Sequence, residues 1–294
     1  MPDRHAFLQQ LPEGFVGLRY FAPPETLRHA FGALYLFTAD RPNFTDTTRA
    51  DFGQLRFMLN GSGFYRFHDG REMPTPRVCL LGPTFGATRF VLDSPACVLG
   101  VSLLPLGWLA IDGDDASRMS DCLADMTLAD ASYGTLLQTL SQIDDVDRAI
   151  DAIWGFLAPR VPPPPPAVAR FVDAVDNWLA DETSPSIEML AAATDLSGRQ
   201  RARLANRLYG APPKLLARKY RALRCAAKIV VDKQPWAELC DEGTFYDQSH
   251  FIREIRHFIG LTPHQLMSDP TDVARLTLQR RDMGGSVAEI NRIS

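Results

Sequence analysis

Residues 247–263 read DQSHFIREIRHFIGLTP, and the spacing of their apolar side chains determines how the C-terminal part of the chain folds. Four apolar residues recur at helical spacing and form one stripe: Phe251, Ile255, Phe258 and Ile259. This period predicts an amphipathic helix. Asp247 is a suitable N-cap, Gly260 a suitable end, and Thr262-Pro263 can begin the next helix.

A second short helix is predicted just upstream, over residues 236–241, followed by a tight connection at 242–244. The other face of the 248–259 helix is mostly polar and cationic. A helix, a short turn and a capped helix with a polar outer face is the layout of a helix-turn-helix, whose second helix reads DNA.

Residues 245–251 (FYDQSHF) and 260–263 (GLTP) resemble the signature of the AraC/XylS family of bacterial transcription regulators. The resemblance extends over roughly residues 167–270. It implies two helix-turn-helix units on one long connecting helix, both entering the major groove of double-stranded DNA.

The periodicity of the preceding residues agrees with such a pair of units. It predicts helices over 168–180, from a cap at Ser184 or Ser186, and over 198–209, capped by Ser197 and ended by Gly210. A long helix then runs from 214 to about 231. Its roughly 18 residues span about 27 Å, and successive major grooves lie about 34 Å apart. A rigid helix of this size can set two recognition helices one turn of DNA apart.

Charge is distributed unevenly along the chain, although its net value is −4. Residues 1–166 hold 13 basic and 19 acidic residues, whereas residues 167–294 hold 18 and 16. Residues 197–228 contain ten Lys and Arg and no Asp or Glu. A local basic stretch is the footprint of a DNA-binding module, with a merely solvated helix face as the alternative.

Two sets of residues are candidates for DNA contact. Spacing on the first recognition helix and the family resemblance on both helices select base contacts at Arg199, Gln200, Ala202, Arg203, Gln248, Ser249, Ile252 and Arg253. Arg reads guanine, Gln reads adenine, and Ala or Ile can touch a thymine methyl. Ile252 has no core role by its spacing. The alternative for the arginines is phosphate contact or solvation. Phosphate contacts are expected from helix N-termini and nearby cations: Arg207, Lys214, Arg218, Arg221, Arg256 and Thr262.

Three residues depart from the family pattern. Arg201 stands where a core Leu is usual, Ala205 replaces an aromatic residue, and Thr244 occupies the usual place of the turn glycine. Burying an unpaired Arg is costly. We therefore expect a weaker or more plastic first unit.

The N-terminal half reads as β-structure. Short strands predicted near 33–37, 54–59, 64–68, 78–81, 88–92 and 97–103 indicate a β-barrel or sandwich. Residues 19–24, 81–83 and 99–101 are similar to an AraC-like subfamily whose N-terminal domain is a cupin-like β-barrel. The expected fold class is therefore α+β. Helices predicted at 107–111, from 123–125 into 132–141, and at 146–157 follow the barrel, and in AraC-like proteins such helices often form a homodimer interface.

Five consecutive prolines mark the domain boundary. We predict a β-rich sensing or dimerisation domain at 1–160 and a polyproline linker at 161–167. A double helix-turn-helix domain at 168–270 and a short helical or loose tail at 271–294 follow. The polyproline strut should hold the two domains apart.

Other classes of protein find little support in the sequence. No apolar run approaches the ~20 residues that span a bilayer, and residues 1–5 lack a signal-peptide layout. The five cysteines form no CxxC pair and read as reduced, mostly buried thiols of a cytoplasmic protein. The N-terminal domain holds only His5, His29 and His68, so neither a metal site nor a catalytic constellation nor a cofactor is predicted.

A small-molecule effector could occupy the barrel. Apolar residues expected to point inward are Leu55, Phe57, Leu59, Phe64, Phe67, Phe85 and Phe90, most of which would fill the core. Polar anchors could come from Arg56, Arg66, Tyr65 and His68, but strand direction does not select among them.

The leading hypothesis is a cytoplasmic, sequence-specific transcription regulator that binds double-stranded DNA. RNA polymerase, a small-molecule effector and a second copy of the chain are possible partners. One alternative is a protein-interaction module whose degraded first unit no longer holds DNA. Another is a barrel enzyme fused to a DNA-binding domain.

Overall fold

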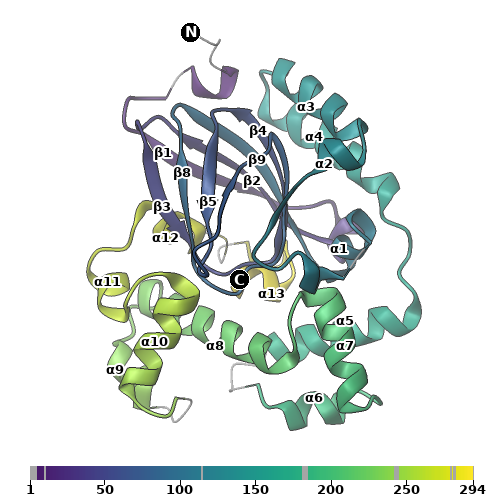
Figure 1. Ribbon diagram of the computed structural model, residues 1–294, viewed down its shortest axis with the longest axis vertical. Helices are drawn as coiled ribbons and strands as arrows, with labels where there is room; N and C mark the ends of the chain where they lie inside the picture. The colour runs from purple at the N-terminus through teal and green to yellow at the C-terminus, as the bar shows by residue number, and fades with distance from the viewer. Residues whose placement is uncertain are drawn as a thin grey trace.

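The computed structural model describes residues 5–9, 11–113, 115–180, 185–241, 245–278, 280 and 283–293. The chain has an α+β fold, with an antiparallel sheet domain followed by a helical domain (Figure 1). One sheet has the order β1 (Val16–Phe21), β2 (Phe31–Ala39), β9 (Ala96–Leu103), β4 (Gly53–Asn60), β7 (Val78–Leu81), β10 (Leu123–Asp125). The other has the order β3 (Phe44–Thr48), β8 (Thr88–Leu92), β5 (Gly63–Arg66), β6 (Glu72–Pro74).

The two sheets pack against each other but do not close into a barrel. One apolar cluster joins them, with Tyr35 and Phe37 from the larger sheet and Phe44, Tyr65 and Phe90 from the smaller. The α+β class is confirmed, while the expected cupin-like barrel is an open pair of sheets. Strands β1, β3 and β6 were not predicted, because they are short or lack clear alternation. Residues 123–125, expected to be helical, instead form β10, which pairs with β7.

Strand β4 is buried on both faces, which corrects the expected lining of the domain interior. Leu55, Phe57 and Leu59 do share a face, as their alternation predicts, but that face packs under α3 (Ser132–Gln142) and α4 (Val146–Leu157). The residues between them, Gln54 and Arg56, face the smaller sheet. Period-2 alternation identifies a shared face and cannot say which layer covers it.

Short helical elements complete the sheet domain. They are η1 (Ala6–Leu8), η2 (Glu25–Leu27), α1 (Pro105–Ile111), η3 (Ala116–Arg118), α2 (Met126–Ala129) and η4 (Ala158–Arg160). Residues 161–165 are not helical, and Pro166 begins α5 (Pro166–Ala180). Proline suits this first position because its missing N–H would have no helical partner there.

The helical domain follows the predicted order. It contains α6 (Ile187–Ala193), α7 (Gly198–Tyr209), α8 (Pro213–Val230), α9 (Trp236–Asp241), α10 (Gln248–Ile259) and α11 (Pro263–Ser268). Figure 1 shows α7 and α10 near opposite ends of α8, below the sheets.

The two domains touch directly, so the expectation that the proline linker keeps them apart is wrong. The backbone N–H groups of Ala50 and Ala87 donate to the carbonyls of Phe258 and His257, each at 2.7 Å. Apolar loop residues of the sheet domain, including Phe52 and Phe85, belong to the same core cluster as the helices. Burial of these side chains outweighs any stiffness of the linker.

The C-terminal segment returns to the sheet domain rather than lying loose. Helix α12 (Asp272–Thr277) packs on β3 and β1, and α13 (Glu289–Ile293) packs on α5 and α8. Arg280 is 2% exposed and Asn291 is 0% exposed. Helix α12 agrees with the short helical stretch expected here, whereas the looseness expected of the remainder does not hold, because α13 and the buried Arg280 and Asn291 anchor it.

All five cysteines are free thiols, and four of them are buried, as the sequence predicts. Among the described helices, none combines the length and the apolarity that crossing a bilayer requires.

Gly260 ends α10 with a φ of +88°, and a Cβ added there would lie 2.6 Å from Cγ2 of Thr47. Gly70 has a φ of +87° and open space around it. Gly260→Ala should lower the free energy of unfolding by about 2–4 kcal/mol, because left-handed strain and a clash add together. Gly70→Ala should cost only about 1 kcal/mol. Urea denaturation measures both, and equal losses would show that the contact between the domains contributes nothing.

Candidate nucleic-acid interface

The first helix-turn-helix unit consists of α5, α6 and α7. Ser186 caps α6, since its hydroxyl accepts from the N–H of Met189 at 3.2 Å, whereas Ser184 lies outside the described residues. Ser197 and Gln200 form a reciprocal capping box at the start of α7, and Gly210 ends it with a φ of +85°. These caps fix both ends of the first recognition helix.

The second unit is built the same way around α10. The Asp247 carboxylate accepts from the N–H of His250 at 2.7 Å, which confirms the predicted N-cap. Phe245 packs edge-on against Phe251 with ring centroids 4.8 Å apart. Thr262 forms a capping box that starts α11.

Helix α8 connects the two units and is buried along much of its length. It packs against α7 at one end and against α10 and α11 at the other. The relative position of the two recognition helices therefore depends on a single continuous element of 18 residues.

Most of the predicted base-contacting side chains lie on the surface. Exposed are Arg199, Gln200, Arg203, Gln248, Ser249 and Arg253, and Ala202 is half-buried. Neither Arg203 nor Arg253 is tucked into the interior. The side-chain oxygen of Gln200 accepts from the N–H of Ser197 at 2.9 Å, so the capping box already uses the acceptor that reading adenine requires.

Ile252 has a core role after all. It is half-buried and packs against the apolar cluster of the helical domain. The spacing argument excluded it from the stripe on α10, but neighbouring helices reach farther around the helix than one stripe.

The fold of the first unit accommodates the residues that depart from the family pattern. Arg201 is half-exposed and its guanidinium donates to the carbonyl of Leu196, so no unpaired charge is buried. Ala205 is 0% exposed within the core. Thr244 lies outside the described residues. Whether the first unit is weaker stays a prediction.

The candidate phosphate contacts fall into two groups. Arg207, Lys214 and Arg256 are exposed, and Thr262 is half-buried as the α11 cap. Arg218 instead holds Glu254 with two hydrogen bonds of 3.0 and 2.7 Å. Burial alone would raise the pKa of Glu254, but these bonds outweigh it and lower that pKa.

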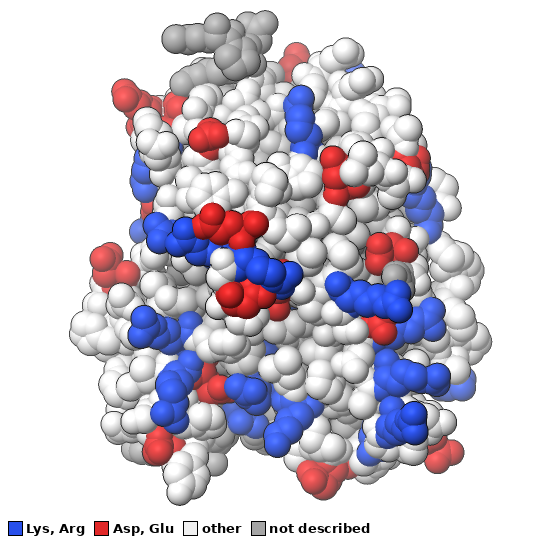
Figure 2. Space-filling view, viewed as in Figure 1, with Lys and Arg blue, Asp and Glu red and all other residues white. Residues whose placement is uncertain are grey.

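Arg221 is also engaged within the domain. It is half-buried, and its guanidinium lies 5.7 Å from the centre of the Phe245 ring. Figure 2 shows Lys and Arg side chains in two groups on the lower part of this face, where α10 and α7 lie in Figure 1.

Tyr246 is a surface residue that the sequence reasoning did not select. It is 92% exposed, immediately before the α10 N-cap. A residue at this position often packs onto the fourth residue of the helix, but Phe245 makes that contact instead. The sequence feature that could have identified Tyr246 was an aromatic residue next to the residues predicted to contact bases.

The second notable site is a cavity between the two sheets. It leaves about 90 Å³ for the centres of water-sized molecules, well above the ~10–15 Å³ that one water needs. Its wall includes Tyr35, Arg56, Tyr65 and Phe90 from the strands. Of the predicted lining, only Arg56, Tyr65 and Phe90 are part of this wall.

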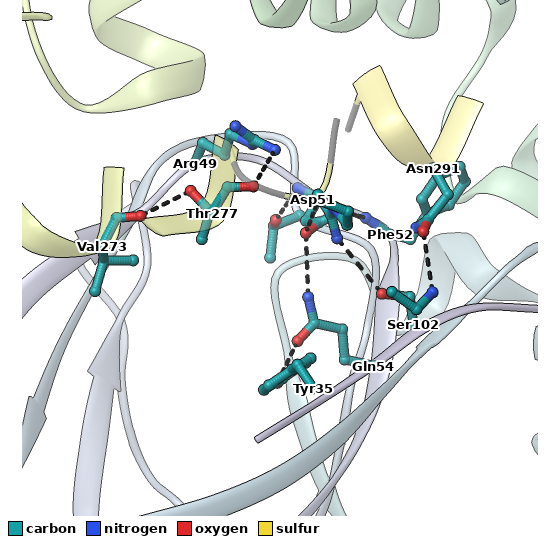
Figure 3. A network of polar contacts seen from close by, with 12 residues as sticks. Tyr35, Arg49, Asp51, Phe52, Gln54, Ser102, Val273, Thr277 and Asn291 are labelled. Atoms are coloured by element: carbon teal, nitrogen blue, oxygen red, sulfur yellow. Dashed lines mark hydrogen bonds and ion pairs between the residues drawn. The ribbon is translucent and has the colours of Figure 1, made fainter. Parts of the chain in front are cut away.

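A hydrogen-bond network runs from the cavity wall toward the helical domain (Figure 3). Arg56 donates to the Gln54 oxygen at 3.0 and 2.8 Å and also to the Tyr65 hydroxyl. The Gln54 amide in turn donates to the Asp51 carboxylate at 3.2 Å. Arg280 donates to the same carboxylate oxygen at 3.0 Å.

Lys219 connects α8 to the same place. Its ammonium donates to the backbone carbonyl of Asp51 at 2.6 Å and lies 4.8 Å from the centre of the Phe85 ring. The side chain is 2% exposed, and burial lowers its pKa to about 8. Within the described part of the chain, no cluster of His, Cys, Asp and Glu could hold a metal ion.

The Arg218–Glu254 pair predicts that two cationic residues of α8 contribute differently to the free energy of unfolding. Arg218→Ala should lower the free energy of unfolding by about 2 kcal/mol, because the nearly buried Glu254 carboxylate loses its charged partner. Lys214→Ala, an exposed change on the same helix, should be nearly neutral. Thermal or urea denaturation distinguishes them, and a silent Arg218→Ala would mean that the pair adds no stability.

Lys219 predicts a pH dependence of stability. Its pKa is about 8 in the folded chain and ordinarily 10.5, so between these values the unfolded chain binds more protons. The free energy of unfolding should therefore gain about 2 kcal/mol from this group between pH 8 and pH 10. Lys219→Met should abolish that gain. An identical pH profile in wild type and variant would mean that folding does not lower the pKa of Lys219.

One family model matches part of the chain, and several solved structures cover most of it. Residues 190–269 match a family model described as a helix-turn-helix domain. None of the curated proteins compared shows significant similarity. Among solved structures, apo ToxT from Vibrio cholerae is 12% identical and has a TM-score of 0.45, covering 87% of this chain and 98% of that chain.

Two further structures give similar results. ToxT with a bound unsaturated fatty acid is 10% identical with a TM-score of 0.45, covering 87% of this chain and 97% of that chain. The AraC-like transcriptional activator CuxR is 16% identical with a TM-score of 0.32, covering 74% and 86%.

Proposed function

With an AraC-type helix-turn-helix domain at residues 190–269, this chain is a DNA-binding transcriptional regulator, and we propose that it reads two adjacent major grooves through α7 and α10. The observation that carries the proposal is the pair of capped recognition helices, each with exposed arginine side chains, joined by α8. The length of α8, about 27 Å, is compatible with two grooves about 34 Å apart once the recognition helices extend from its ends.

We assign base reading mainly to the arginines. Arg199 and Arg203 on α7, and Arg253 on α10, can each bond guanine through two N–H groups. Gln248 is exposed at the first position of α10 and can read adenine. Ser249, Ala202 and Ile252 can make fewer contacts with bases. The side-chain oxygen of Gln200 is used in the capping box, so only its N–H₂ group can contact a base.

We assign phosphate contact to Arg207, Lys214, Arg256 and the N-terminus of α11 at Thr262. These groups are accessible and at helix ends or outer faces, where they can meet the DNA backbone. Arg218 and Arg221 are weaker candidates, because Glu254 and Phe245 already engage their guanidinium groups.

The cavity between the sheets is our proposed effector site. Arg56 is 8% exposed, and the partners described above are an amide oxygen and a hydroxyl, which do not neutralise its charge. A buried cation flanked by aromatic rings suits a small molecule with one acidic group and an apolar body. Such a ligand would shift the populations of domain arrangements.

Assembly and location extend the same proposal. A regulator of this type acts on DNA in the cytoplasm, where its thiols stay reduced. A homodimer through the sheet domain and contact with RNA polymerase are expected partners that sedimentation and pull-down assays can test.

Selection of bound genomic fragments, followed by Arg203→Ala and Arg253→Ala, tests the reading of DNA. Each variant should lose about 1–3 kcal/mol of binding and relax the motif at one position. Arg19→Ala, an exposed change on β1, is the control and should bind as wild type does.

Binding measured at two salt concentrations separates the alternatives. If both variants bind all DNA sequences more weakly by the same factor, the two arginines contact phosphates and not bases. A wild-type chain that binds no fragment at either salt concentration would favour a protein-interaction module instead.

A further inference from the structure

The described residues of 271–293, which exclude 279, 281 and 282, form a segment that we call the strap. It begins beyond the helix-turn-helix match, which ends at residue 269. From α11 it crosses to the sheet domain and then returns, through α13, to α5 and α8 of the helical domain. Figure 1 shows α12 beside the sheets and α13 between the sheets and the helices.

Buried polar contacts anchor the strap to the sheet domain. The N–H of Val273 donates to Asp46 at 2.9 Å, and the amide oxygen of Asn291 accepts from the N–H of Ala33 at 3.0 Å. Arg280 pairs with Asp51 at 3.0 Å. Because Asp46, Asn291 and Arg280 are all less than 8% exposed, breaking these contacts would cost hydrogen bonds that are shielded from water.

The strap also forms part of the cavity wall. Val273, Thr277 and Arg280 line it beside the strand residues. Figure 3 shows Val273 and Thr277 on one side of Asp51 and Asn291 on the other, with Gln54 and Tyr35 below. A ligand in the cavity would therefore touch strap side chains only while the strap is docked.

We propose that the strap locks the helix-turn-helix domain onto the sheet domain, and that a ligand in the cavity tightens this lock. A ligand that gains contacts only in the docked arrangement must favour that arrangement. Docking in turn fixes the last turn of α10, through the bonds from Ala50 and Ala87. The second half of this inference rests on the proposed effector role of the cavity.

Hydrogen exchange at the amides of Ala50 and Ala87 tests the lock, because both amides are bonded across the domain boundary. Arg280→Met, which removes the ion pair, should speed exchange at both amides about tenfold or more. Arg275→Met is the matched control, since Arg275 lies on α12 but is exposed. The amide of Leu99, in the middle of β9, should stay slow in both variants. Equal exchange in the two variants would overturn the proposal.

A cut chain gives a second test that alters none of the anchoring side chains. A specific protease site inserted after the exposed Asp269 allows the strap to be separated from α11. If Arg280→Met also speeds exchange at Leu99, the substitution has destabilised the whole sheet domain. The cut protein then provides the test of the lock. Faster exchange at Ala50 and Ala87 with a slow Leu99 supports the lock, and no change on cutting rejects it.

Naphthalene-2-carboxylate, an acid with an apolar body, serves as the probe for the cavity. At ten times its dissociation constant, measured by calorimetry, it should slow exchange at Ala50 and Ala87 about tenfold in the wild-type chain. Binding without slowing would overturn the control by ligand. Absence of binding would overturn the acidic ligand class proposed for the cavity. Neither readout uses DNA, so failure of DNA binding would be a separate result.

Discussion

Asp51 is the point where the cavity, the connecting helix and the C-terminal segment meet. Its carboxylate accepts from Gln54 and Arg280, and its backbone carbonyl accepts from Lys219 of α8. Three parts of the chain far apart in sequence thus share one residue. Because these groups are shielded from water, each bond is strengthened, and losing one leaves an uncompensated charge or dipole. The mutual placement of the domains depends on this junction more than on the linker between them.

The larger sheet explains why such a junction can exist. Its outer face is covered by α3 and α4, and its inner face by the smaller sheet, so β4 is buried on both sides. The apolar residues of β4 pack under the helices. Its polar residues, Gln54 and Arg56, are left facing the space between the sheets, where Tyr35 and Tyr65 supply hydrogen bonds. The cavity therefore combines polar groups with aliphatic and aromatic side chains, which is the composition of a small-molecule site.

Contact between the domains reaches the recognition helices at their C-terminal ends. Gly210 and Gly260, which end α7 and α10, lie against the sheet domain, where any larger residue would meet neighbouring atoms. The arginine side chains proposed to read DNA, Arg199, Arg203 and Arg253, remain exposed. A change in how the sheet domain docks would therefore act on the ends of α7 and α10 and not on the side chains proposed to read DNA.

The sequence alone determined the local structure of the helical domain. Helical spacing and capping residues such as Ser197, Asp247 and Thr262 specify each helix through interactions within a few residues, so the two units could be predicted. The exposure of Arg203 and Arg253 follows from the same periodicity. In the sheet domain, alternation located β4 but could not say which face met the helices.

Only the tertiary structure decided what depends on partners distant in the chain. Arg218 meets Glu254, Arg280 meets Asp51, and Ile252 packs into a core formed by other helices. No local pattern encodes these pairings, because each arises where packing brings remote segments together. For the same reason, a tail that reads as loose in sequence is a buried strap in the folded chain.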